Sequence, residues 1–130
     1  MIHFTHFTQF ITITNLNWLP ILQNNYHKQI IIEGLSNRVT KKQVTIYGFV
    51  LMPNHMHLIW QLHDNIIKEH FQRDFLKFTA RSILQFMRMH EDPLLESLKV
   101  SAPDGQYQVW ERNSLSIDIY SEKILLQKLN

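Results

Sequence analysis

Two short apolar runs joined by a tight turn constrain this chain more than any other feature. Residues 44–51 and 55–61 are rich in β-branched, aromatic and other apolar side chains, and Pro53-Asn54 stands between them. Pro and Asn favour turns, so the two runs predict an antiparallel β-hairpin. Side chains two apart on a strand point to the same face, so His55 and His57 are expected side by side. Two adjacent imidazoles form half of a metal site, or an acid–base pair.

The first part of the chain predicts a strand and a helix that can join this hairpin. Residues 7–14 are rich in β-branched and aromatic side chains, which is typical of a strand. A helix is predicted over residues 19–33, with Asn17 as its cap and Gly34 ending it. Residues 36–42 then form a polar, basic loop.

The second part predicts a long helix, a short strand and a last helix. The long helix covers residues 64–90 and ends before Asp92-Pro93. Residues 106–111 are expected to form the fourth strand, and Ser116 or Asp118 to start the final helix. The order β-α-β-β-α-β-α predicts an α+β fold: a ferredoxin-like antiparallel four-stranded sheet with two helices on one face and an added C-terminal helix.

Composition narrows the class of protein. At 130 residues the chain forms a single domain over 1–130, and the absence of cysteine excludes disulfides, thiolate metal sites and a cysteine nucleophile. It also fits a cytoplasmic location. No apolar run approaches the roughly 20 residues of a membrane span, so no membrane partner is expected. The net charge of +2 permits an acidic partner such as nucleic acid.

The long helix carries the candidate contacts to such a partner. At 100° per residue, the cations Arg73, Lys77 and Arg81 fall on one arc, and apolar side chains fill most of the remainder. The stripe is either a phosphate-binding surface or an ordinary solvated face. Elsewhere the three tryptophans, Trp18, Trp60 and Trp110, are predicted to anchor the core. Glu111 is expected to pair with Arg112 rather than approach a metal.

The spacing of the histidine pair leaves several functions open. A divalent ion held by two imidazoles keeps positions for water or a phosphate oxygen, and it can polarise a phosphodiester. A structural module with an incidental pair shows the same spacing. A nucleotide hydrolase with three alternating histidines is disfavoured because Ile59 occupies the third place.

Residues 47–58 read YGFVLMPNHMHL, which closely resembles the signature of the single-tyrosine HUH transposases. Within them the run is most similar to the subgroup associated with repetitive extragenic palindromes (REP). The family's His-hydrophobic-His element falls on His55 and His57. Residues 71–79 and 108–111 agree as well, and the resemblance extends over nearly the whole chain from Phe10.

The resemblance implies an activity, a cofactor and partners. His55 and His57 would hold Mg²⁺ or Mn²⁺. A tyrosine on the C-terminal helix would attack single-stranded DNA, giving a 5′-phosphotyrosine and a free 3′-OH. The resemblance also implies recognition of hairpin DNA beside the cleavage site. It further implies a homodimer in which the Tyr helix of one subunit completes the site of the other.

One family element is not matched. The family's run Lys-Leu-x-Tyr-Ile-x-x-Asn-Pro is matched by residues 128–130 in its first three places, and the Tyr would come next, beyond Asn130. Among the tyrosines present, Tyr120, near the start of the predicted last helix, is the second-choice candidate for the nucleophile. The expectation is therefore a transposase-like protein that binds structured single-stranded DNA without cleaving it. The alternative is a non-catalytic DNA-binding regulator derived from a transposase.

Overall fold

The computed structural model describes residues 6–101, 106–119 and 122–129. This part of the chain contains four strands, three α-helices and three short 3₁₀ turns. The strands and α-helices, in chain order, are β1 (Thr8–Thr14), α1 (Asn25–Thr40), β2 (Val44–Met52), β3 (His55–Leu62), α2 (Lys68–Met89), β4 (Leu115–Ile119) and α3 (Glu122–Leu129). The 3₁₀ turns are η1 (Leu16–Trp18), η2 (Ile21–Gln23) and η3 (Leu95–Leu98).

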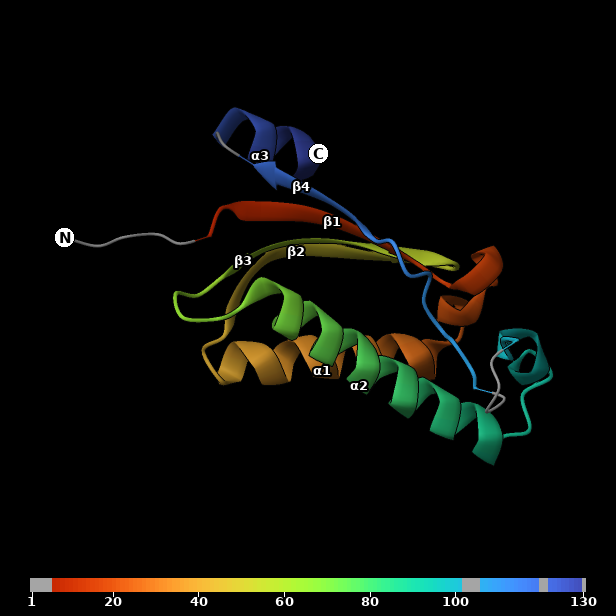
Figure 1. Cartoon of the computed structure of the whole chain (residues 1–130). Coiled ribbons are helices and arrows are strands. Elements are labelled where there is room, and N and C mark those ends of the chain that lie inside the picture. The colour runs from red at the N-terminus through yellow and green to blue at the C-terminus, as the bar shows by residue number, and fades with distance from the viewer. Residues whose placement is uncertain (1–5, 102–105, 120–121, 130) are drawn as a thin grey trace.

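The four strands form one sheet in the order β2-β3-β1-β4, and all neighbouring strands are antiparallel. Helices α1 and α2 lie together on one face of the sheet, and α3 lies on the other (Figure 1). This strand order with this helix layer is the ferredoxin-like arrangement, so the predicted α+β fold is confirmed. None of the helices in the described ranges is long and apolar enough to cross a lipid bilayer.

The hairpin predicted from the sequence forms the centre of this architecture. Strands β2 and β3 turn at Pro53-Asn54, with Met52 opposite His55 and Val50 opposite His57. The turn is also tied to the segment that follows β1. The Asn15 N–H donates to the Asn54 carbonyl at 2.9 Å, and the Leu22 N–H donates to the Pro53 carbonyl at 2.9 Å. These bonds hold the start of β3 in place against the end of β1.

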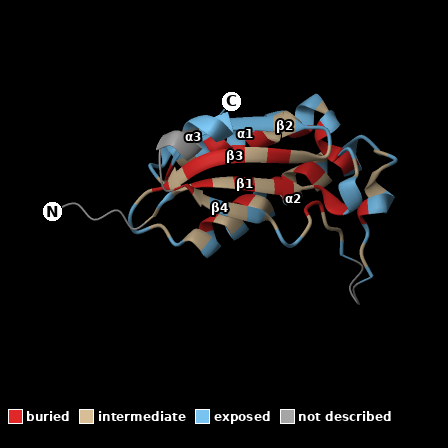
Figure 2. Cartoon of the chain, turned by 90° about the horizontal axis from the view of Figure 1, so that it is seen from above, coloured by how far each residue is buried: buried red, intermediate tan, exposed pale blue. Residues whose placement is uncertain are grey.

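Strand alternation divides the sheet into a buried face and a more open one. On β1, Ile11 and Ile13 are fully buried, whereas Phe10, Thr12 and Thr14, which alternate with them, are only partly covered. Trp60 of β3 is buried beneath the helices and meets the rings of Phe71 and Phe75 edge-on, at 5.1 and 6.0 Å. Seen from above, β1 and β3 are the strands with the most buried positions, and much of β2 and α3 is exposed (Figure 2). The core therefore lies between the sheet and the α1–α2 layer.

Helix α1 differs from the prediction at both ends. It begins at Asn25, after an Asn24 side chain that accepts the Tyr26 N–H at 2.8 Å, and it runs through Gly34 to Thr40. Residues 25–33 are helical as predicted, but the predicted start at residue 19, the Asn17 cap, the end at Gly34 and the loop over 36–42 are wrong. A Cβ at Gly34 would lie 3.3 Å from a ring carbon of Phe75. This glycine lets α1 approach α2 closely instead of ending the helix.

The fourth strand also lies elsewhere than predicted. Residues 106–111 contribute only isolated bridges, Asn15 with Trp110 and Lys99 with Tyr107, so the strand predicted there is wrong. The strand is β4, in the segment where Ser116 or Asp118 was expected to start a helix. Apolar and polar residues alternate along β4, and its apolar Leu115 and Ile117 are exposed. The predicted order of elements still holds.

Candidate functional site

His55 and His57 project side by side from β3, on the sheet face that α3 partly covers and α1 and α2 do not. Their ring centroids are 4.9 Å apart and the rings are inclined by 76°. Both side chains are partly buried, whereas Met56 between them is fully buried on the opposite face. The structure therefore confirms the placement expected from strand alternation.

Each ring is oriented by a hydrogen bond at Nδ1. His55 Nδ1 donates to Asn54 Oδ1 at 2.8 Å, and Thr12 Oγ1 of β1 lies 2.9 Å from His57 Nδ1. When Nδ1 carries the proton, Nε2 presents a lone pair. Histidines that bind metals usually donate their other ring N–H to an oxygen in this way. With both Nδ1 atoms engaged in this way, the Nε2 atoms are the ones left to coordinate a divalent ion.

Aromatic rings and the C-terminal helix surround the pair. Phe10 stacks on His57 with 5.2 Å between centroids, and the Lys128 Nζ lies 4.9 Å from the Phe10 ring centroid. A Cβ at Gly48 would lie 3.0 Å from a methyl carbon of Leu129, so this glycine allows α3 to lie against the sheet. Helix α3 thereby brings its last turn, with Lys128, beside the histidines.

The electrostatic setting favours the neutral form of one imidazole. Burial lowers the pKa of His57 below its ordinary value, and the positive charges of His55 and Lys128 lower it further. A neutral imidazole is the form that binds metals, so this ring is ready to act as a ligand at neutral pH.

The pair alone does not complete a coordination shell. Among the described residues, no group of three or more His, Cys, Asp or Glu side chains is arranged to hold a metal ion. Glu111 Oε1 accepts the Asn17 N–H at 2.7 Å, and the predicted pairing of Glu111 with Arg112 does not form. Water or a phosphate oxygen could complete the shell.

A cleft of about 570 Å³ lies beside His55. Trp18 lines it, and the Trp18 and His55 rings meet at a steep angle of 63° with 6.2 Å between their centroids. Trp60 and Trp110 are core anchors as predicted, with 1% and 5% of their surfaces exposed. Trp18 is not, because 63% of its surface is exposed. The sequence did not reveal this difference, since nothing in the local pattern shows that the turn after β1 points away from the core.

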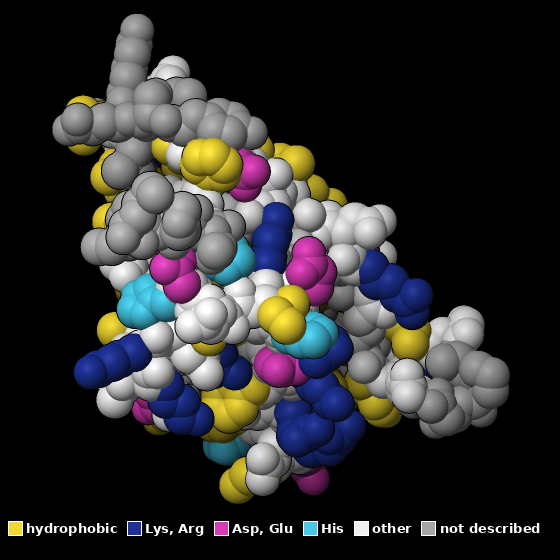
Figure 3. Space-filling view, turned by 60° about the vertical axis from the view of Figure 1, so that its left-hand side comes forward, with side chains coloured by type: hydrophobic (Ala, Val, Ile, Leu, Met, Phe, Trp, Pro, Cys, Tyr) yellow, Lys and Arg dark blue, Asp and Glu magenta, His cyan; other side chains and the backbone are white. Residues whose placement is uncertain are grey.

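The predicted DNA-binding cations lie on the other layer of the molecule. Arg73, Lys77 and Arg81 are exposed on α2, whose buried side faces the sheet, so the sheet separates them from the histidine pair. Arg73 forms an ion pair with the neighbouring Asp74 at 3.2 Å. In Figure 3, where the helix layer stays below, most of the Lys and Arg side chains gather in the lower half. The structure therefore does not bring the stripe and the pair into one pocket.

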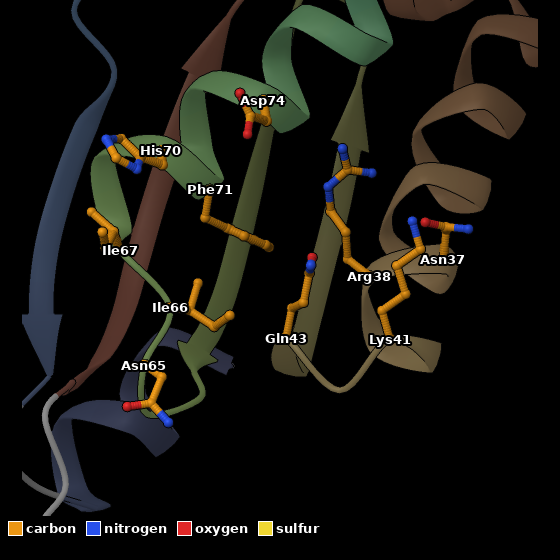
Figure 4. A pocket seen from close by; sticks show the side chains of 10 residues that line it. All are labelled: Asn37, Arg38, Lys41, Gln43, Asn65, Ile66, Ile67, His70, Phe71 and Asp74. Atoms are coloured by element: carbon orange, nitrogen blue, oxygen red, sulfur yellow. The ribbon is translucent and has the colours of Figure 1, made fainter.

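A second hollow, of about 430 Å³, opens between the end of α1 and the start of α2. Arg38 from α1, Lys41 directly after α1, and His70 and Asp74 from α2 surround it (Figure 4). Arg38 packs over the Phe75 and Phe78 rings, 5.3 Å from each centroid, and burial lowers its pKa whereas Asp74 raises it. The sequence did not predict this ordered cation, because Arg38 fell within the loop expected over residues 36–42.

The comparisons with known proteins come from solved structures. No family model and no curated protein matches this chain. The structure of the REP-associated tyrosine transposase bound to a REP hairpin is similar over 98% of this chain, with 16% identity and a TM-score of 0.66. This chain has the fold of a REP-associated tyrosine transposase. It spans 66% of that protein's length.

A second structure agrees with the first. A protein described as a transposase from Deinococcus radiodurans R1 is similar over 98% of this chain and 88% of its own length. The identity is 13% and the TM-score 0.65. At these identities the two likenesses establish a common fold.

The setting of His57 leads to a first prediction. Its imidazole should titrate below the ordinary His value because protonation adds a charge to a partly buried site near other positive charges. Replacing Lys128 with Met removes one of these charges and should raise the pKa of His57. NMR titration of the His ring protons in the metal-free protein measures both shifts. A pKa of His57 above the ordinary value would contradict this electrostatic account.

Proposed function

We propose that this chain is a transposase-like protein of the single-tyrosine HUH family that binds structured single-stranded DNA with a divalent cation. The observation that carries the proposal is the oriented pair His55 and His57 on the open sheet face of a transposase fold. The fold alone suits many functions, so the pair and the sequence signature around it carry the chemistry.

The metal would be Mg²⁺ or Mn²⁺, held by His55 and His57 through Nε2. Bound there, the ion would polarise a phosphodiester and stabilise the negative charge at its oxygens. The protein's own part is to orient the rings: Asn54 and Thr12 engage the two Nδ1 atoms, and Phe10 stacks on His57.

The DNA would be a hairpin with an adjoining unpaired strand. One structural neighbour is bound to a REP hairpin, and we propose the same class of ligand for this chain. Arg73, Lys77 and Arg81 would contact phosphates from the helix layer. Arg112 lines the cleft next to His55 and also the hollow that contains Arg73, so it lies between the two surfaces. A strand passing Arg112 would connect the basic stripe with the histidine pair.

We further propose that these 130 residues bind DNA without cleaving it, as a regulator would. The sequence has four tyrosines, and three of them are described. Tyr26 stacks on Phe86, Tyr47 donates to Gln61 and Tyr107 donates to Glu96, so their rings or hydroxyl groups are engaged away from the histidines. Tyr120 lies outside the described residues.

We also propose a homodimer that uses the sheet face around the site. Large apolar side chains are exposed there on both edge strands, namely Val50, Met52, Leu115 and Ile117. Burying such a patch against a second copy would remove apolar surface from water, as protein–protein interfaces commonly do.

Metal binding is the most direct test of the site. Replacing His55 or His57 with Ala should weaken Mn²⁺ binding by about tenfold or more, because even the loss of a residue that orients a ligand has effects of this size. Isothermal titration calorimetry measures the affinity. The control is His63→Ala, which removes an imidazole that bonds to Thr45 Oγ1 beyond the end of β3. Unchanged Mn²⁺ affinity in both site variants would refute the metal site.

DNA cleavage is tested separately with a labelled hairpin that carries single-stranded extensions. Incubated with Mn²⁺ and run on a denaturing gel, the 130-residue chain should give no covalent protein–DNA adduct. An adduct that disappears on replacing Tyr120 with Phe would contradict this and identify the nucleophile.

Salt dependence tests the basic stripe. Replacing Lys77 with Gln should reduce the slope of log Kobs against log salt by about 0.7 for a single-strand phosphate contact, or about 0.9 for a duplex one. Replacing Arg73, Lys77 and Arg81 together should reduce it by about two to three. Lys99→Gln, an exposed lysine outside the stripe, is the matched control. An unchanged slope in the triple variant would exclude phosphate contacts there.

A further inference from the structure

Trp18 is an aromatic side chain whose exposure the core does not explain. It has 63% of its surface exposed, whereas the other two tryptophans are buried. Indole rings bury large areas when they stabilise a fold. An exposed one beside a candidate site is therefore a candidate ligand contact.

The backbone that carries this ring has an unusual conformation. Asn17 and Trp18 have φ values of 53° and 58°, in the left-handed region that residues other than glycine rarely adopt. Three hydrogen bonds hold the turn: Asn17 N–H to Glu111 Oε1 at 2.7 Å, Trp18 N–H to the Asn15 carbonyl at 3.0 Å, and Leu19 N–H to the Leu16 carbonyl at 3.1 Å. Such strain persists where the surrounding structure enforces it, often at functional sites.

The surroundings of the ring suit a nucleotide. The Trp18 ring stands beside His55, with 6.2 Å between centroids, and lines the cleft of about 570 Å³. The other residues of that cleft are polar or charged, namely Thr14, Gln108, Glu111, Arg112 and Asn113. Arg112 and Asn113 are both exposed. A flat apolar ring next to a cation and an amide matches a ligand that has a flat base and a phosphate.

We propose that the indole of Trp18 is a stacking platform for one unpaired nucleobase of the bound DNA strand, with Arg112 contacting an adjoining phosphate. This inference rests on the proposed function and specifies how the single-stranded part is held next to the histidine pair. Aromatic side chains stack on any base, because every base has a π-face. The platform would therefore hold the strand without selecting its sequence. From Arg112 the DNA strand would continue toward Arg73 on α2.

The test compares two DNA probes in the presence of Mn²⁺: a hairpin carrying a short oligothymidylate tail, and the same hairpin without the tail. Because Trp60 and Trp110 are buried, Trp18 should dominate any change in indole emission when the tail binds. The tailed hairpin should quench the emission and the blunt hairpin should not. Trp18→Ala should weaken binding of the tailed hairpin by about tenfold and leave the blunt hairpin unaffected.

Two variants serve as controls. Trp18→Phe keeps a stacking ring but loses the indole signal, so it should retain most of the affinity for the tail. Tyr26→Ala removes a ring of similar exposure (67%) that is already stacked on Phe86, and it should bind both probes as the parent does. Circular dichroism confirms that each variant is folded.

The outcomes separate the two proposals. If the parent binds neither probe, the proposed function fails, and the platform fails with it. If the parent binds both hairpins but Trp18→Ala and Trp18→Phe keep the full preference for the tail, the platform alone is overturned. Loss of the blunt hairpin together with the tailed one in Trp18→Ala would also overturn it, since that pattern indicates a structural role.

Discussion

The structure depends on the pairing of β3 with β1 and β2 in a register that sends His55 and His57 to one face and Met56, Leu58 and Trp60 to the other. A shift of one residue would exchange the two sets and expose the core side chains. The Pro53-Asn54 turn and its hydrogen bonds to Asn15 and Leu22 oppose such a shift. The hydrophobic core and the candidate site are thus two consequences of the same register.

The open face of the sheet is available for a site because the helix layer takes up the other face. Phe75, Ile83 and Met87 of α2 cover the buried side, so the sheet is stabilised without the residues around the histidines. Those residues can then serve the site: Thr12 and Asn54 orient the imidazoles, and α3 brings Lys128 near them. The positive charge of Lys128 both helps to keep His57 neutral and would attract a phosphate.

The positions of the cations set the path that a DNA ligand would take. The basic stripe on α2 and the histidine pair lie on opposite sides of the sheet, so a ligand that contacts both must pass around its edge. Arg112 is placed for this, since it lines hollows on both sides. A hairpin on the helix layer and an unpaired strand running to Trp18 and His55 would satisfy this geometry.

The sequence by itself determined the hairpin, the adjacent placement of His55 and His57, the long helix α2 and the order of the elements. These features follow from local rules of strand alternation, helical periodicity and turn chemistry. The tertiary structure alone decided the role of Gly34, which lies inside α1 and leaves room there for Phe75 of α2. It also decided that β4, with its partly exposed apolar residues, pairs as the edge strand beside β1. Exposure of Trp18 and burial of Trp60 and Trp110 depend on which surfaces meet, and no local pattern distinguishes the three residues.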